Sequence, residues 1–195
     1  MLKDILKNKN IILASGSPRR QQFFKDLDFN FTIRLKEIEE IYPDHLKAEE
    51  ISDYLAELKA NAFTDLKPND ILITSDTIVW HNNKALGKPK NLKEAITIIT
   101  SLSDDTHDVI TSVCFKTVHQ TKVMHNTTKV TFKKLTTEEI EYYVNKHRPL
   151  DKAGAYGIQE WIGLIGISKI EGSYFNVMGL PTHLVYEMLT TLAKS

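Results

Sequence analysis

The chain has 195 residues, 42% of them apolar and 26% charged, which is typical of a soluble globular protein with one domain or one two-lobed domain. Its 25 basic residues balance 25 acidic ones, so no global field favours nucleic acid or an anionic membrane, and a polyanionic ligand needs a local basic cluster. The single Cys114 excludes an internal disulfide, and the absence of a signal-peptide or membrane-spanning apolar run predicts a cytoplasmic protein without a membrane partner.

The first informative segment begins with an apolar run at residues 11–13, which predicts a buried strand, followed by the turn Ser15-Gly16-Ser17. Pro18 favours the first position of a helix, with the preceding serine as its N-cap. Arg19 and Arg20 then fall in the first helical turn, where the helix dipole disfavours cations unless an anion is present. The alternative is a pair of solvated surface arginines. We favour a bound phosphate, because the free N–H groups, the dipole and the guanidinium groups all attract one.

Residues 29–43 form a mixed segment that contains the acidic run Glu37-Ile38-Glu39-Glu40. Apolar residues then recur at helical spacing from about Leu46 to Phe63, which predicts an amphipathic helix. Lys59 lies at the margin of this apolar stripe, about 70° from its centre at the usual 100° per residue. Its aliphatic stem can cover the core while its ammonium reaches a neighbouring cleft, although a lysine taken singly is more often solvated.

The run from Ile71 to Trp80 is rich in β-branched residues and predicts a central strand. Asp76 interrupts this run with a residue type poorly suited to a strand interior. Because an isolated buried carboxylate is costly, such an aspartate is normally paired, bound to a metal or turned toward a cleft. Two roles stay open from the residues alone. One is a general base or metal ligand, and the other is an aspartate at a strand end or bulge that bonds to local backbone.

The remaining segments alternate between strands and helices without a strict βαβ repeat, which predicts an α/β fold with a mixed sheet. No internal repeat, low-complexity tract or flexible linker interrupts residues 1–195, so we expect a single domain. After the central strand we expect a hairpin turn at 81–84, a loop at 87–90 and a helix that is capped at Asn91 and reaches Leu102. Paired strands at 109–118 and 123–132 follow, and then a helix that begins with a Thr136–Glu139 capping box and ends before Pro149. The last predicted elements are a glycine-bearing loop at 151–158, a strand at 161–170 and a helix from Pro181.

A second lysine, Lys88, lies between Gly87 and Pro89 and can join Arg20 and Lys59 around a polyphosphate, although taken singly it is also more often solvated. A nucleoside triphosphate carries about four negative charges, so its site needs several cations, a divalent metal or both. Glu39 and Glu40 are candidate metal ligands, although acidic runs are usually solvated faces.

Several other classes of site are excluded by their motifs. The chain has no GxxxxGK[ST] loop, no GxGxxG, no HExxH and no paired CxxC, which removes P-loop, Rossmann, zincin and zinc-finger sites. Ser15 and Ser17 lack a nucleophile elbow, so a serine hydrolase is disfavoured.

Five sequence blocks carry a family resemblance. They are Leu13-Ala-Ser-Gly-Ser-Pro-Arg-Arg20, Ser75-Asp-Thr-Ile-Val79, Leu86-Gly-Lys-Pro89, Asp151-Lys-Ala-Gly-Ala-Tyr-Gly-Ile-Gln159 and Gly172-Ser-Tyr-Phe-Asn-Val-Met-Gly-Leu-Pro181. In this order they resemble the Maf family of nucleoside triphosphate pyrophosphatases, over about residues 11–192. The resemblance implies an inosine triphosphatase-like α/β fold, in which an elongated mixed β-sheet is flanked by helices and two lobes surround a central cleft.

The resemblance also implies the reaction: cleavage of a nucleoside triphosphate between its α- and β-phosphates, with a divalent metal (Mg²⁺ or Mn²⁺), to give the monophosphate and pyrophosphate. It implies that Asp76 accepts a proton and that Glu40, together with Asp76, lies near the metal. The remaining positions that it implies are the phosphate contacts Ser15, Ser17, Arg20, Lys59 and Lys88 and the specificity residues Arg19, Thr77 and Gln159.

The specificity residues, together with residues 155–158, resemble the dTTP/UTP branch of the family rather than the branch that acts on 7-methyl-GTP. Two departures stand out: Glu160-Trp161 follows Gln159 where many relatives have a glycine, and Asp104-Asp105 replaces a common Ser-Gly. Neither lies on an expected phosphate contact, but the first can reshape the base pocket.

Two further hypotheses stay open. One is a non-catalytic nucleotide-binding regulator of cell division or septum formation, against which the acid at position 76 argues. The other is a house-cleaning pyrophosphatase for modified pyrimidine nucleotides. In each case the expected partner is a small nucleoside triphosphate and not a nucleic acid, and the family suggests a homodimer.

Overall fold

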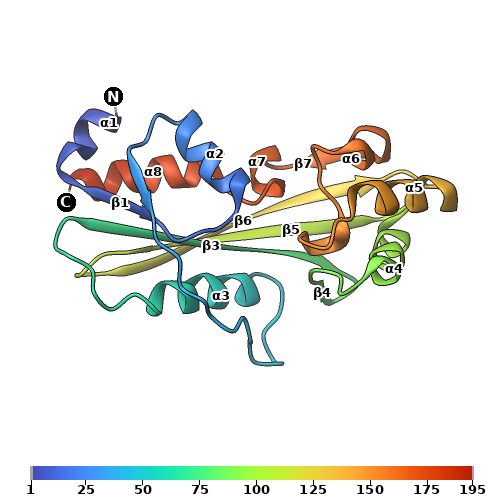
Figure 1. Cartoon of the computed structure of the whole chain (residues 1–195), viewed down its shortest axis with the longest axis horizontal. Helices are drawn as coiled ribbons and strands as arrows, with labels where there is room; N and C mark the ends of the chain where they lie inside the picture. The colour runs from blue at the N-terminus through green and yellow to red at the C-terminus, as the bar shows by residue number, and fades with distance from the viewer. Residues whose placement is uncertain (1, 195) are drawn as a thin grey trace. The chain divides into compact units, whose positions relative to one another are not determined.

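The computed structural model describes residues 2–194 of the chain and shows a mixed α/β fold (Figure 1), which confirms the predicted fold class. Within these residues seven strands form one sheet in the order β2-β1-β3-β5-β6-β7, and β4 pairs with β3. The strands are β1 (Asn10–Leu13), β2 (Phe31–Ile33), β3 (Asp70–His81), β4 (Lys84–Leu86), β5 (Thr106–Lys116), β6 (Thr121–Phe132) and β7 (Ile167–Glu171). The helices are α1 (Leu2–Ile5), η1 (Leu6–Asn8), α2 (Pro18–Asp26), α3 (Glu49–Asn61), α4 (Leu92–Leu102), α5 (Thr137–His147), η2 (Ala153–Ala155), α6 (Trp161–Gly166), α7 (Tyr174–Val177) and α8 (Thr182–Lys194).

Packing divides the chain into two compact units. The first comprises Met1–Asp76, Thr111–Asn126 and Gly179–Ser195, and the second comprises Thr77–Ile110 and Thr127–Met178. The long strands β3, β5 and β6 contribute residues to both units. All helices between residues 2 and 194 are too short or too polar to span a bilayer.

In the first unit, β1 is parallel to both β2 and β3. Helix α3 covers one face of these strands, and α2 and α8 lie on the other side (Figure 1). The contact with α3 is close because the helix presents the small, fully buried Ala56 and Ala60 to Ile12 of β1 and Leu72 of β3. This packing fixes the last turn of α3, which carries Lys59, against the sheet.

Local signals predicted several element boundaries correctly. Helix α2 begins at Pro18, and the Asn91 side chain caps α4 by accepting a hydrogen bond from the Glu94 N–H. The capping box between Thr136 and Glu139 is also present at the start of α5. The two side-chain caps satisfy backbone N–H groups within one helical turn, and the fixed φ of proline suits the first helical position, so the sequence alone specifies these boundaries.

The second unit has its own core, built on Val79, Val109 and Val130 from three neighbouring strands and covered by α4, α5, η2 and α6. Its β3–β4 hairpin turns through Asn82 and Asn83, whose φ angles of 49° and 59° lie in the left-handed region that asparagine tolerates. This confirms the predicted hairpin turn.

The predicted strand over residues 161–170 is wrong in its first half, where the chain forms α6, and β7 begins only at Ile167. The Glu160 carbonyl accepts hydrogen bonds from the N–H groups of Gly163 and Leu164 and so closes a helical turn. A Cβ at Gly163 would lie 1.9 Å from the carbonyl oxygen of Ile158, so only glycine permits this close approach. A short apolar run has no period that separates a strand from a buried helix.

A buried histidine in the second unit makes stability depend on pH. His107 is 2% exposed, and its Nε2 lies 2.7 Å from the Tyr156 hydroxyl. Burial, with a smaller contribution from His81, lowers the pKa of His107 from its ordinary 6.5 to about 3. Between these values the unfolded chain binds a proton that the folded protein does not bind, so the folded state loses stability as the pH falls.

We therefore expect the free energy of unfolding to fall by about 2 kcal/mol more in the unaltered protein than in His107→Gln when the pH is lowered from 7 to 5. Urea unfolding of both proteins at the two pH values measures this difference. Equal pH dependence in the two proteins would show that His107 does not titrate as its burial requires.

Candidate active site

The candidate site lies in the first unit, where the chain leaves β1 beside the middle of β3. The two strands are parallel, with Leu13 paired to Ile73, and the Ala14 N–H donates to the Ile73 carbonyl at 2.9 Å. In open α/β sheets, ligands bind beyond the carboxyl ends of such strands. The fold therefore brings the first motif block of the chain next to the block that contains Asp76.

The turn before α2 is held by Ser15. Its buried hydroxyl accepts a hydrogen bond from the Ser17 N–H at 3.2 Å, and its carbonyl accepts one from Gln21 Nε2 at 3.1 Å. Ser17 occupies the predicted N-cap position with extended backbone, but its hydroxyl caps no helical N–H among the described residues. The serine that shapes this turn is therefore Ser15, two residues earlier than the N-cap.

Arg20 joins two distant segments of the chain. Its Nε donates to the Gly179 carbonyl at 2.7 Å, and its Nη1 donates to the Ser75 carbonyl at 2.8 Å. Burial lowers the pKa of the guanidinium from its ordinary value, while the negative charge of Asp76 opposes this shift and Arg19 adds to it. The Arg20 charge thus lies close to Asp76, and the planar guanidinium is fixed by two carbonyls, which an ammonium does not match.

Lys59 connects the two acidic residues of the site. Its Nζ lies 2.6 Å from Asp76 Oδ1 and 2.9 Å from Glu40 Oε1. The Lys59 and Asp76 side chains are 17% and 10% exposed. Two residues before Asp76 on β3, the Thr74 hydroxyl donates to the Ala56 carbonyl of α3 at 2.6 Å, so alternate residues of β3 face this helix. Asp76 therefore pairs with a side chain from a neighbouring helix, and its carboxylate is not confined to local backbone.

The acidic pair also bears on metal binding. No group of three His, Cys, Asp or Glu side chains in residues 2–194 is arranged to hold an ion. Glu40 and Asp76 nevertheless direct one carboxylate oxygen each to the same ammonium group, that of Lys59. Mg²⁺ is commonly held by one or two carboxylates, with substrate phosphates and waters completing its six ligands. These two carboxylates fit that requirement, but they do not form a complete metal cage.

The structure places the predicted site residues in two groups. Those in the first unit are Ser15, Ser17, Arg19, Arg20, Glu40, Lys59 and Asp76, and those in the second unit are Thr77, Lys88 and Gln159. Within the second unit, Lys88 and Gln159 are both exposed and lie on loops, and Thr77 follows directly after Asp76 on β3. The Gly154 N–H donates to the Gly87 carbonyl at 3.2 Å, so the loop that carries Lys88 is tied to the loop that leads to Gln159.

Sequence reasoning missed the groups that hold Arg20. They are backbone carbonyls of Ser75 and Gly179, and a carbonyl gives no signal in a residue pattern. It also missed the side chain of Ser75, which is buried and whose hydroxyl has no hydrogen-bond partner within residues 2–194. The sequence did contain one signal for these groups, because Ser75 and Gly179 both lie inside the motif blocks.

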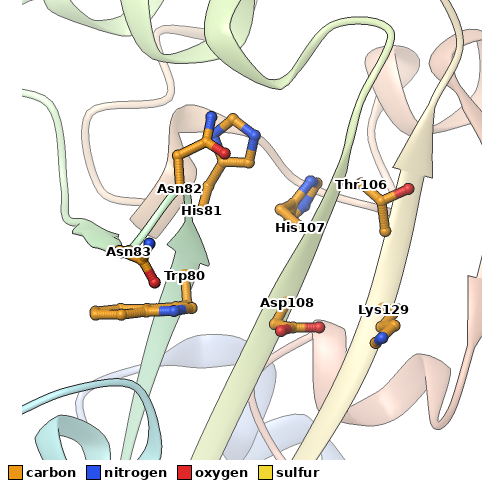
Figure 2. Close-up of a pocket in the computed structure, with 8 residues that line it drawn as sticks. All are labelled: Trp80, His81, Asn82, Asn83, Thr106, His107, Asp108 and Lys129. Atoms are coloured by element: carbon orange, nitrogen blue, oxygen red, sulfur yellow. The ribbon is translucent and has the colours of Figure 1, made fainter.

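A separate pocket lies in the second unit and has a volume of about 420 Å³ (Figure 2). Trp80, Asp108 and Lys129 lie side by side on its wall, on the neighbouring strands β3, β5 and β6. The complete lining is Trp80, His81, Asn82, Asn83, Thr106, His107, Asp108 and Lys129. No predicted site residue is in this set, so the expected chemistry is not located there.

Comparisons with known proteins place the chain in a family. A family model described as Maf-like protein matches residues 10–192. The chain is 66% identical over 193 residues to a dTTP/UTP pyrophosphatase of Flavobacterium johnsoniae, covering 98% of this chain and all of that protein. It is 58% identical over 196 residues to a protein of the same name from Christiangramia forsetii, with both chains fully covered.

Solved structures agree on the fold. A HAM1 protein from Coxiella burnetii matches with a TM-score of 0.53 at 15% identity, covering 94% of this chain and 99% of that one. The Ham1 protein of Staphylococcus aureus matches with a TM-score of 0.52 at 17% identity, covering 92% and 100%. The family match runs from the start of β1 into α8, and the predicted resemblance is confirmed: the chain belongs to the Maf family.

Proposed function

We propose that the protein hydrolyses nucleoside triphosphates, above all dTTP and UTP, to the nucleoside monophosphate and pyrophosphate. The observation that carries this proposal is the cluster of Arg20, Lys59 and Glu40 around Asp76 of β3. It combines fixed cations for a polyanion with a shielded carboxylate that can accept a proton. Relatives that match along the whole chain are named dTTP/UTP pyrophosphatase, which supports the choice of substrate.

Asp76 acts as the general base in this proposal. Water attacks the α-phosphorus, its oxygen forms a new bond to phosphorus, and its proton passes to the Asp76 carboxylate. The bond between the α-phosphorus and the bridging oxygen breaks, and pyrophosphate leaves with that oxygen. The Lys59 ammonium, 2.6 Å from Asp76 Oδ1, holds the carboxylate in one orientation.

The cations stabilise the charge that grows on the phosphates. Arg20 and Lys59 are already held in place by protein groups, so little reorganisation is needed when substrate binds. Further donors for phosphate oxygens are the N–H groups in the first turn of α2 and the Ser75 hydroxyl, for which residues 2–194 provide no hydrogen-bond partner. Lys88 stays a predicted phosphate contact, and Arg19, Thr77 and Gln159 stay predicted determinants of base choice.

Glu40 and Asp76 would hold a divalent ion, Mg²⁺ or Mn²⁺, together with oxygens of the substrate. When bound, such an ion supplies positive charge that neutralises phosphate oxygens. We also propose that the protein acts in the cytoplasm on free nucleotides and not on nucleic acid. The homodimer that the family suggests stays a prediction.

Product analysis tests the proposed function. The full chain is incubated with dTTP or UTP and Mg²⁺ or Mn²⁺, with an EDTA sample as control. We expect dTMP or UMP and pyrophosphate in equal amounts, and no turnover with EDTA. Release of the diphosphate and inorganic phosphate, or binding of the nucleotide without turnover, would contradict the proposal. Comparing kcat/KM for 5-methyl-UTP and pseudo-UTP with that for dTTP separates a house-cleaning role from an ordinary one.

A further inference from the structure

Gln159 is presented by a tight turn in the second unit. The Glu160 N–H donates to the Gly157 carbonyl at 3.0 Å, so residues 157–160 close a turn with Gln159 at its exposed tip. An exposed side chain on a turn has little packing of its own to restrict it. The orientation of Gln159 is therefore set by the contacts that hold the two ends of the turn, Gly157 and Glu160.

Both ends of this turn are bound to one hydroxyl group. Tyr143 of α5 is fully buried, and its hydroxyl accepts a hydrogen bond from the Gly157 N–H at 3.1 Å. The same hydroxyl donates to Oε2 of Glu160. Burial and the neighbouring carboxylate raise the pKa of Tyr143 above its ordinary value, so the phenol keeps the proton that it donates.

The Glu160 carboxylate is held from a second side. Its Oε1 lies 3.2 Å from the Nζ of Lys152, whose side chain is largely buried. Although Glu160 occupies the N-cap position of α6, its side chain caps no N–H of that helix within the described chain. A Cβ at Gly157 would lie 2.8 Å from Glu160 Cδ, so glycine at this end of the turn leaves room for the carboxylate. The side chain of Glu160 is thus committed to Tyr143 and Lys152.

We propose that Tyr143 and Glu160 are positioning residues that fix the Gln159 turn and thereby set the preference of the enzyme for pyrimidine nucleotides. This inference rests on the proposed function and adds two residues to it. A polar side chain discriminates between bases only when its orientation is held, because a mobile group can adapt to the wrong base.

The test compares two tyrosines of the same helix. Tyr143→Phe removes the hydroxyl from the turn, while Tyr142→Phe removes the hydroxyl that accepts a hydrogen bond from Lys146 and leaves the turn untouched. We expect Tyr143→Phe to lower the ratio of kcat/KM for dTTP to that for GTP by about 10- to 100-fold. Tyr142→Phe is expected to keep the ratio of the unaltered enzyme.

Two further measurements separate positioning from general stability. Glu160→Gln keeps an acceptor for Tyr143 and should retain most of the discrimination that Glu160→Ala loses, which also covers the case in which Tyr143→Phe does not fold. In a Gln159→Ala background, Tyr143→Phe should change the ratio no further, because both substitutions act through the same side chain.

The outcomes distinguish the two proposals. If dTTP is hydrolysed and Tyr143→Phe and Glu160→Ala keep the unaltered ratio, the positioning role is wrong and the proposed function stands. An equal loss for dTTP and GTP together with a lower melting temperature also overturns positioning, because it indicates a structural role only. If the unaltered protein hydrolyses none of these nucleotides, the proposed function fails and the specificity role fails with it.

Discussion

Asp76→Asn is expected to lower kcat for dTTP by about 10²–10⁴ with little change in KM, which is the usual contribution of a positioned general base. Asparagine keeps the size and the hydrogen-bonding oxygen of the side chain but cannot accept the proton of the attacking water. Lys59 still pairs with Glu40 in this variant, so the cations that hold the phosphates are retained. Steady-state kinetics with dTTP at saturating metal measures the two constants separately.

Asp53→Asn is the matched control for this experiment. Asp53 belongs to the first unit, lies on α3 before the turn that carries Lys59, and its carboxylate is bound by Ser112 and His125. We expect this variant to keep kcat within a few-fold of the unaltered value, because it alters a structural carboxylate only. A near-normal kcat for Asp76→Asn would remove Asp76 from the chemistry.

Replacing Lys59 with methionine is expected to lower kcat/KM for dTTP by about 10²–10³, the typical loss when one preorganised cationic or hydrogen-bond donor is removed. Methionine keeps an unbranched apolar side chain but removes the charge shared by Asp76 and Glu40. Without it, the two carboxylates repel each other and the incoming triphosphate. The Lys59→Met/Asp76→Asn double variant should lose less than the two single losses combined, because the residues are in direct contact.

The control for Lys59 is Lys116, a lysine of β5 that contacts the end of the same helix. The Lys116 ammonium donates to the Ala60 carbonyl at 3.2 Å and to Asn61 Oδ1 at 3.1 Å, and neither acceptor is a carboxylate. Lys116→Met is therefore expected to leave kcat/KM nearly unchanged. An equal loss in both variants would mean that Lys59 acts through the stability of α3 and not through the site.

Features that depend on neighbouring residues in the chain could be predicted from the sequence. Pro18 marks the start of α2, the Thr136–Glu139 capping box marks α5, and two asparagines turn the β3–β4 hairpin. In each case the backbone preference or the capping hydrogen bond involves only a few neighbouring residues, so composition and spacing contain the information. The same argument explains why Asp76 stood out, since one charged residue in an apolar run is visible without any tertiary structure.

Features that depend on distant segments could not be predicted in this way. The carbonyls that hold Arg20 are 55 and 159 residues away along the chain, and no local rule selects them. The link between Tyr143 and the turn at residues 157–160 likewise needs α5 to pack beside the loop. The apolar run at residues 161–166 has no period that separates a strand from a helix, and the close backbone approach of Gly163 to Ile158 in α6 depends on tertiary structure.

The position of the new oxygen in the products is the most direct test of water attack on the α-phosphorus. A single turnover of dTTP is run in H₂¹⁸O with the unaltered enzyme, and both products are examined by mass spectrometry. If water activated at Asp76 attacks the α-phosphorus, one ¹⁸O atom appears in dTMP and none in pyrophosphate. Label in pyrophosphate with unlabelled dTMP would place the attack on the β-phosphorus and contradict the assignment of the site.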